Sequence, residues 1–275
     1  MPNTIQHLII GASGKTGSRI HAKLTKLGFQ PKAASRDGEV KFDWNDPTTW
    51  SQALTGIDSV YLTYFPDLAI AKAPEDISRF CALAKIKGVN HITLLSGRGE
   101  PAAQVCENIV KQSGMSWTIV RASWFNQNFS EGLFKHFIMG GHIALPVNAV
   151  TEPFIDIDDI ADVACASLIE PGHSGQLYEV TGPELLSFAE LASRFSRILG
   201  RKIDFTQITL EDFKQKLAKD QIDIGIIEAL SYLFTEVLDG RNEYLTDGVK
   251  RALGRMPKSF DQYIVDNAHH FTEGK

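Results

Sequence analysis

The sequence predicts an α/β protein built around a doubly wound parallel sheet. Short, β-rich apolar runs alternate with helical segments over roughly the first 125 residues, and a glycine-rich turn follows the first run. Strands that alternate with helices of about 10–15 residues form βαβ units. The right-handed crossover rule makes such strands parallel and places helices on both faces of the sheet.

The expected strands are apolar runs that end at turn residues. They cover residues 7–11, 32–36, 40–43, 59–65, 91–96 and 116–122. The first intervening helix is expected over residues 15–27. The later helices are expected to begin at Pro47 with Asp46 as N-cap, at Pro74 and at Pro101, because proline suits the first helical turn.

The alternation changes after residue 124, where helical patterns dominate. A helix is expected over 187–199, where apolar residues recur on one face, and an apolar helical stretch over 210–240. Residues 154–170 predict a short strand and then a helix capped by Asp158 or Asp159. The other expected elements are a helix over 126–141 and a strand over 177–182.

Composition excludes several classes of protein. The chain has 275 residues with 28 basic and 33 acidic side chains, a balance that argues against nucleic acid as the main partner. No apolar run approaches the roughly 20 residues of a membrane span, and no signal peptide is recognisable. Cys81, Cys106 and Cys165 lie far apart without a metal-binding or redox spacing. We therefore expect a cytoplasmic protein that binds neither nucleic acid, membrane nor metal.

The glycine-rich turn carries the most informative motif. Gly11, Gly14 and Gly17 follow a strand and open a helix, with the G-x-x-G-x-x-G spacing typical of short-chain dehydrogenase/reductase relatives. Such glycines permit a tight turn, a close approach of the backbone to a pyrophosphate and close helix–strand packing. The motif therefore predicts a Rossmann-like nucleotide site; a turn without ligand is the alternative.

The residues after the next two strands bear on the choice of cofactor. Arg36 lies 19 positions after Gly17, where an arginine accepts the 2′-phosphate of NADP(H). The neighbouring Asp37 keeps NAD(H) open, and Arg36 as a solvated turn residue is the other alternative. Asp43 ends the third strand, where it is expected either to face the adenine amine or to serve as a turn residue.

The usual proton donor of short-chain reductases is missing. None of the six tyrosines has a lysine four positions later, and Ser96 alone is a poor acid. Two interpretations follow. Either the protein reduces an acceptor that needs no strong acid, such as an iminium, a quinone or an activated alkene, or it binds the cofactor without turnover. The sequence identifies no catalytic residue, and Ser96 is the one candidate.

Several segments resemble one family. They are the turn at 11–17 and residues 113–129, 152–164, 178–201 and 249–271. Together they resemble the NmrA-like atypical short-chain dehydrogenases/reductases. Residues 41–54 and 59–69 look most like the festuclavine/agroclavine dehydrogenase group of these proteins, which reduce cyclic iminium ions.

The resemblance implies roles for particular residues. Cofactor-binding residues would be Gly11, Ser13, Gly14, Lys15, Thr16, Gly17, Arg36, Asp43, Phe65, Pro66 and Ser96. Substrate-binding residues would be Tyr64, Trp124, Phe125 and Asn128. The family's isoflavone-reductase branch carries a catalytic lysine after the fifth strand, where this chain has Ala103, Gln104 and Val105, so that chemistry is not expected.

We therefore expect an NAD(P)H-dependent reductase, with NADP(H) favoured, that delivers hydride to a conjugated or cationic small molecule. An NADP(H)-binding redox sensor is the alternative. Residues 1–150 would form the cofactor-binding domain, to which about 151–182 return, and 183–275 would mainly form a small, mostly helical substrate lobe. The apolar segment 222–238 would line the substrate pocket or the surface of a homodimer.

Overall fold

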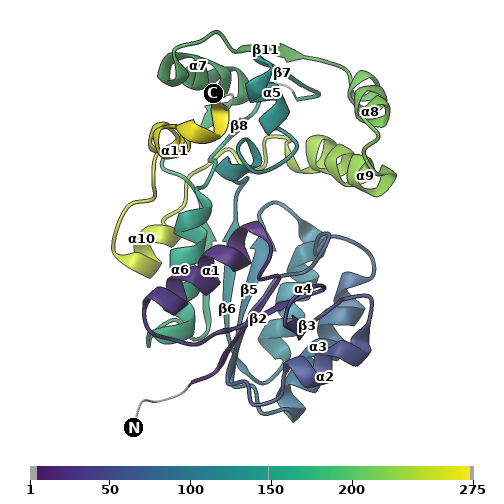
Figure 1. Cartoon of the computed structure of the whole chain (residues 1–275), viewed down its shortest axis with the longest axis vertical. Coiled ribbons are helices and arrows are strands. Elements are labelled where there is room, and N and C mark those ends of the chain that lie inside the picture. Colours follow the sequence, from purple (N-terminus) through teal and green to yellow (C-terminus); the bar gives the residue numbers. More distant parts are fainter. Residues whose placement is uncertain (1–4, 148, 273–275) are drawn as a thin grey trace. The chain divides into compact units, whose positions relative to one another are not determined.

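The computed structural model describes residues 5–147 and 149–272 and divides into two compact units. The first unit comprises residues 1–122, 157–180 and 246–256. The second comprises residues 123–156, 181–245 and 257–275. Each unit thus collects segments that are distant in the sequence (Figure 1).

The first unit is organised around a seven-stranded parallel sheet. Its strands are β1 (His7–Ile10), β2 (Lys32–Ser35), β3 (Val40–Lys41), β4 (Ser59–Leu62), β5 (His91–Gly97), β6 (Ser116–Ala122) and β9 (Gln176–Val180). The spatial order is β3-β2-β1-β4-β5-β6-β9, and every neighbouring pair is parallel. The chain winds outward from β1 on one side and resumes at β4 on the other. This confirms the predicted Rossmann-like fold class and places its topological switch point between β1 and β4.

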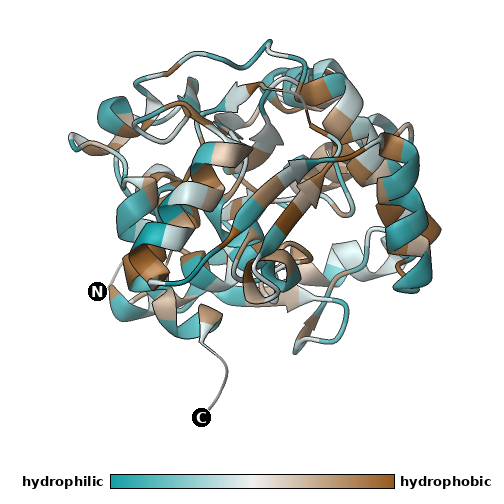
Figure 2. Cartoon of the chain, turned by 90° about the horizontal axis from the view of Figure 1, so that it is seen from above, coloured by the Kyte–Doolittle hydropathy of each residue, from teal (hydrophilic) through white to brown (hydrophobic). Residues whose placement is uncertain are grey.

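Helices cover both faces of this sheet (Figure 1). The helices α1 (Lys15–Lys26) and α6 (Ile157–Ile169) bury their apolar side chains against Ile9 and Tyr61 on one face. The opposite face is covered by η1 (Pro47–Thr49), α2 (Trp50–Ala53), α3 (Ala73–Ile86) and α4 (Pro101–Gln112). Helix α10 (Gly248–Leu253) packs beside α6 and β9. Brown and teal stretches alternate along the helices in Figure 2, as expected for amphipathic helices with one buried face.

Helix boundaries follow the capping rules in most places. Asp46 caps the segment that begins at Pro47, and its side chain accepts a hydrogen bond from the Thr48 amide, as predicted. The prediction that Asp158 or Asp159 caps α6 was wrong, because the helix begins at Ile157 and both residues lie in its first turn. Carboxylates in a first turn interact favourably with the helix dipole, and this explains why the sequence pattern resembles a cap.

The second unit is smaller in strand content and mostly helical. Its helices are η2 (Asn126–Asn128), α5 (Lys135–Met139), α7 (Phe188–Leu199), α8 (Leu210–Lys219), α9 (Ile224–Tyr232), η3 (Leu233–Val237), α11 (Phe260–Asp266) and η4 (Ala268–Phe271). Its short strands form two pairs, β7 (His142–Leu145) with β11 (Asp204–Gln207) and β8 (Thr151–Glu152) with β10 (Leu186–Ser187). The single helix predicted over 126–141 is therefore wrong. It is split into η2 and α5, and Gly132 lies in the turn between them.

Aromatic side chains form the core of the second unit. Phe129 lies at its centre, with its ring about 6 Å from those of Phe134, Phe154, Phe195 and Phe260. No helix within the described residues is both long and apolar enough to cross a membrane.

Candidate cofactor and substrate site

The glycine-rich turn lies at the switch point of the sheet and is held closely against its neighbours. Gly11 has a φ of +71°, and a Cβ on it would lie 2.7 Å from the Thr63 methyl group after β4. The Gly14 amide donates a 2.8 Å hydrogen bond to the Gly11 carbonyl. A Cβ on Gly17 would collide with that same carbonyl oxygen. Gly11 and Gly17 thus each have a steric reason, which an ordinary solvent-exposed turn would not require.

Helix α1 presents its amino terminus at this turn. Gly14 is its N-cap, its first turn contains no acidic residue, and no side chain in the described ranges caps it. Exposed Ser13 and half-buried Lys15 flank the helix end. Thr16 points inward and accepts a 2.9 Å hydrogen bond from the buried Tyr61 hydroxyl. Amide groups at an uncapped helix start are suited to an anionic group such as a phosphate.

Two side chains predicted to contact the cofactor meet beside this turn. Arg36 follows β2 and Phe65 follows β4, the two strands that flank β1. The Arg36 guanidinium carbon lies 5.2 Å from the centre of the Phe65 ring. The Phe65 ring is 64% exposed, and a cis peptide bond joins it to Pro66. A charged group and an aromatic face are thus both accessible at the carboxyl edge of the sheet.

Asp43 takes part in a local turn. Its Oδ1 accepts a 2.9 Å hydrogen bond from the Asn45 amide, and its carbonyl accepts one of 2.7 Å from the Trp50 indole. The carboxylate is half-exposed, so its second oxygen is the one suited to a ligand. The turn role and the adenine-binding role predicted for this residue therefore remain compatible.

Ser96 belongs to a buried ionic network. It is 4% exposed, and its hydroxyl donates a 2.8 Å hydrogen bond to Glu107 on α4. Burial alone would raise the pKa of Glu107, but hydrogen bonds from Arg121 and Ser96 bring the pKa below its usual value. Arg121 also pairs with Glu179 of β9, 3.3 Å away. In this arrangement the Ser96 proton is engaged with a carboxylate, so the hydroxyl is better suited to accept a hydrogen bond than to donate one.

Tyr64 lies in the core of the first unit. It is 8% exposed, its ring centre lies 4.7 Å from that of Trp44, and its hydroxyl donates a 2.7 Å hydrogen bond to Asp76. Burial raises the pKa of Tyr64, and the neighbouring Asp76 carboxylate adds to this effect. Its predicted contact with a substrate would require the side chain to leave this position.

The remaining predicted substrate residues lie together in the second unit. Trp124, Phe125 and Asn128 are all partly exposed. The Trp124 ring is nearly parallel to that of Phe134, with their centres 6.3 Å apart, and contacts Phe234 of η3 at 5.6 Å. The Asn126 amide donates to the Ile155 carbonyl and holds this segment against the next one. A partly exposed aromatic surface of this kind is suited to a flat, apolar ligand.

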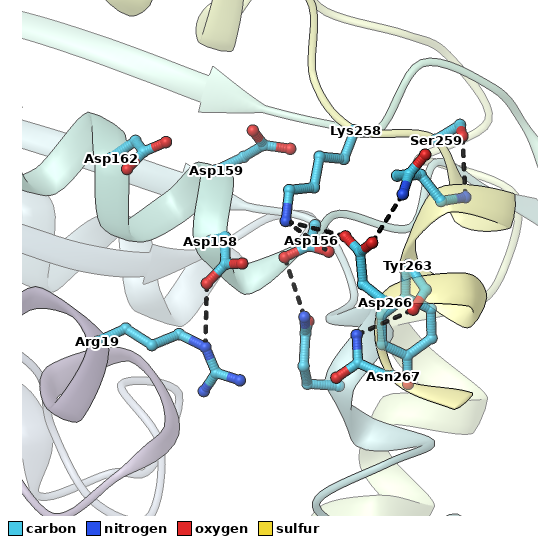
Figure 3. Close-up of polar contacts among 12 residues, drawn as sticks. Arg19, Asp156, Asp158, Asp159, Asp162, Lys258, Ser259, Tyr263, Asp266 and Asn267 are labelled. Carbon is cyan, nitrogen blue, oxygen red and sulfur yellow. Dashed lines mark hydrogen bonds and ion pairs between the residues drawn. The ribbon is translucent and has the colours of Figure 1, made fainter. Parts of the chain in front are cut away.

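The acidic residues around 156–162 are engaged in ion pairs within their own units. In the first unit Arg19 contacts Asp158 at 3.2 Å (Figure 3), and Arg255 contacts Asp159 at 2.5 Å. In the second unit, Lys258 lies 4.0 Å from Asp156 (Figure 3). Asp156 also accepts a 2.9 Å hydrogen bond from the side-chain amide of Gln127. These contacts support a structural role for the acidic segment.

One carboxyl pair at the edge of the sheet was not anticipated from the sequence. Asp67 follows β4 and Glu100 follows β5, and burial together with the nearby Asp67 carboxylate raises the pKa of Glu100 to about 9. The available signal was an acidic residue placed directly before the proline that opens α4. Elsewhere in the described ranges, no group of three or more His, Cys, Asp or Glu side chains is arranged to hold a metal ion.

The fold and the glycine turn together define the class of the protein: an α/β protein with a dinucleotide-type phosphate loop at the switch point of a parallel sheet. The sequence profile of the NmrA-like family matches residues 103–264. The chain belongs to the NmrA-like family, which confirms the resemblance.

Relatives match nearly the whole chain. Prestalk A differentiation protein A of Dictyostelium discoideum is 31% identical over 92% of this chain and 82% of its own length. Festuclavine synthase II of Penicillium roqueforti is 30% identical over 96% of this chain and 97% of its own. The NAD(P)H azoreductase of Xenophilus azovorans is 28% identical over 96% of this chain and 98% of its own length.

Solved structures share the fold at lower identity. Triphenylmethane reductase of Citrobacter sp., complexed with NADP(H), superposes with a TM-score of 0.83 at 18% identity, covering 95% of this chain and 99% of its own. The NADPH-dependent quinone oxidoreductase of Escherichia coli superposes with a TM-score of 0.81 at 18% identity, covering 97% of this chain and 100% of its own. At these identities the likeness concerns the fold.

Proposed function

We propose that the protein is an NADPH-dependent reductase that delivers hydride to a conjugated or cationic small molecule, such as a cyclic iminium ion or a quinone. The observation that carries this proposal is the phosphate loop, whose close-packed glycines lead into an uncapped helix at the switch point of the sheet. A location in the cytoplasm and a homodimer formed through residues 222–238 complete the proposal.

The residues present fit a nicotinamide dinucleotide. Backbone amides of residues 13–16 would hold the pyrophosphate, with Lys15 beside it. Arg36 would pair with the 2′-phosphate of NADP(H), and the Phe65 ring beside Arg36, with Pro66, would border the same end of the cofactor. When bound, the cofactor supplies the hydride. The chain's own contribution is to orient the acceptor and exclude water, with Trp124 and Phe125 as the aromatic surface for it.

The relatives support an oxidoreductase. Two of them are named as a festuclavine synthase and an NAD(P)H azoreductase, and two structures of similar fold were solved with NADP(H) or NADPH bound. These names mention azo, triphenylmethane and quinone reduction and the synthesis of festuclavine, so they support the cofactor more strongly than any one acceptor.

Cofactor binding is tested first, by titrating the protein with NADPH and with NADH. Arg36→Ala should weaken NADPH binding by roughly 10- to 100-fold, because hydrogen bonds to a charged group contribute about 1.5–3 kcal/mol. NADH binding should change little. Lys26→Ala is the matched control, since this exposed lysine carries the same charge at the opposite end of α1. Equal losses for both cofactors would refute the assignment of Arg36.

Turnover is tested with a panel of cyclic imines, quinones and azo dyes, followed by the loss of NADPH absorbance. An NADP(H)-binding regulator is the second candidate function. It is favoured by the similarity to a differentiation protein and by the absence of Tyr-x-x-x-Lys from the sequence. Tight NADPH binding without turnover of any acceptor class would favour the regulator, and steady turnover would exclude it.

A further inference from the structure

The Arg36 side chain is held by an aromatic ring and not by an acid. Its guanidinium carbon lies 5.2 Å from the centre of the Phe65 ring. Among the described residues no carboxylate pairs with it, although Asp37 and Glu39 belong to the same loop between β2 and β3. Other arginines of the first unit do have carboxylate partners, namely Arg19, Arg79, Arg98, Arg121 and Arg255. The donors of the Arg36 guanidinium are therefore available to an anionic ligand.

The Phe65 ring is not part of the core. It is 64% exposed, whereas the ring that Arg79 covers in a similar contact, that of Trp50, is buried. Exposure of a phenyl ring to water costs free energy, so its position requires a reason other than hydrophobic burial. The contact with Arg36 supplies one, because a guanidinium over an aromatic face is attracted by the ring electrons.

This contact crosses the strand that leads into the phosphate loop. Arg36 follows β2 and Phe65 follows β4, and these strands lie on either side of β1. Thr63, two residues before Phe65, is in contact range of Gly11 in the loop. The ring therefore holds the guanidinium at the carboxyl edge of the sheet, where open α/β sheets bind their ligands.

A second cation lies beside Arg36. The Lys41 ammonium donates a 3.2 Å hydrogen bond to the Arg36 carbonyl, and in the described part of the chain no carboxylate pairs with this exposed lysine. Lys41 belongs to β3 and pairs with Ser35 of β2. Its neighbour Val40 packs against the core on the face of α2–α4, and side chains alternate along a strand, so Lys41 lies on the face that carries α1.

We propose that Lys41 and Phe65 complete the site for the 2′-phosphate. Lys41 supplies a second positive charge, and Phe65 is a positioning residue that acts through the Arg36 guanidinium. This inference rests on the proposed function, in which Arg36 pairs with the 2′-phosphate of NADP(H). A phosphate monoester carries close to two negative charges at neutral pH, so two cations match it better than one. The 2′-hydroxyl of NAD(H) carries no charge, and the two residues therefore raise the preference for NADP(H).

The size of each effect follows from the exposure of the groups. A cation over an exposed ring contributes roughly two- to fivefold to an equilibrium constant, equivalent to about 0.5–1 kcal/mol. The ring also restricts the guanidinium before the nucleotide binds, so less rotamer freedom is lost on binding. An exposed charge pair contributes up to about fivefold and is weakened by salt, which makes the Lys41 contribution the more salt-dependent one.

The experiment measures binding of NADP⁺ and NAD⁺ by calorimetry. The two nucleotides differ only in the 2′-phosphate, and without an acceptor no reaction takes place, so the ratio of their Kd values isolates this group. Phe65→Leu should lower the preference for NADP⁺ roughly two- to fivefold, whereas Phe65→Tyr keeps the aromatic face and should retain it. Lys41→Gln should lower the preference up to about fivefold at low salt, and Lys41→Arg should retain it.

A double variant tests whether the ring acts through the arginine. In an Arg36→Ala background, Phe65→Leu should have no further effect on the preference for NADP⁺. Ile86→Ala is the matched control, because it removes another exposed apolar side chain, on α3, and should leave both Kd values unchanged. Equal losses for NADP⁺ and NAD⁺ in Phe65→Leu would overturn the positioning role, since the ring would then act on a part that both nucleotides share. An unchanged preference in Lys41→Gln would overturn the role of the second cation.

The outcomes separate this inference from the proposed function. A preference for NADP⁺ that depends on Arg36 but persists in Phe65→Leu and Lys41→Gln overturns the inference alone. A wild-type protein with no preference for NADP⁺ overturns the assignment of Arg36, and the inference with it. The expected losses in a protein that turns over no acceptor support the inference and overturn the proposed reductase activity.

Discussion

The close approach of α1 to the phosphate loop predicts that Gly17→Ala lowers the stability of the protein, whereas helix propensity alone predicts an increase. Gly17 is the third residue of α1, and a Cβ added to it would overlap the Gly11 carbonyl group and lie 3.1 Å from the Ala12 Cα. These are backbone atoms, which cannot rotate aside as a flexible side chain does. The helix and the strand would have to separate for alanine to fit.

The magnitude follows from two opposing contributions. Helix propensity alone predicts that Gly17→Ala stabilises the protein by about 1 kcal/mol. Overpacking typically costs about 1–3 kcal/mol, and a clash with backbone belongs at the upper end. The net loss should be about 2 kcal/mol, which lowers the unfolding temperature by roughly 5 °C for a chain of this size.

Thermal unfolding of the cofactor-free protein measures this change without any assumption about function. Ala22→Gly is the control, because Ala22 is exposed on the same helix and the reverse substitution there should cost about 1 kcal/mol through propensity alone. A Gly17→Ala protein more stable than wild type would refute the inference that α1 and the turn are too close to accommodate a side chain at this position. Gly17→Ala should also weaken NADPH binding, since the amides that would hold the phosphates move with the helix.

Two further predictions concern stability. Burial, with smaller contributions from the charges of His173 and His7, lowers the pKa of His91 to about 4, so the stability it contributes is full above about 6.5 and is lost as the pH falls toward 4. Urea unfolding should therefore show that the free energy of unfolding of the wild type falls between pH 7 and pH 5, and that this fall is roughly 2 kcal/mol smaller in His91→Gln. Equal falls in the two proteins would refute this. Ser187→Ala should cost about 1 kcal/mol and Ser187→Thr much less, because Ser187 and Glu190 form a reciprocal capping box at α7; an unchanged urea midpoint for Ser187→Ala would contradict this role.

The parallel sheet was predictable because its signals are local. Each βαβ unit is indicated by an apolar run, a turn and the start of a helix. Pro47 and Pro101 lie at two of these helix starts. The family was predictable for the same reason, since its motifs are contiguous. The split of residues 126–141 was not predictable, because the sequence pattern around Gly132 is compatible with a continuous helix, whereas the structure has η2 and α5 with a turn between them.

The state of the candidate site residues depends on partners that are distant in sequence. Ser96 looks like a free hydroxyl at a strand end until Glu107 and Arg121 are brought beside it by α4 and β6. Tyr64 looks like an aromatic residue at the edge of the sheet until Asp76 of α3 accepts its hydrogen bond. Strand patterns show which residues reach the edge of the sheet, but not which of them are already satisfied there.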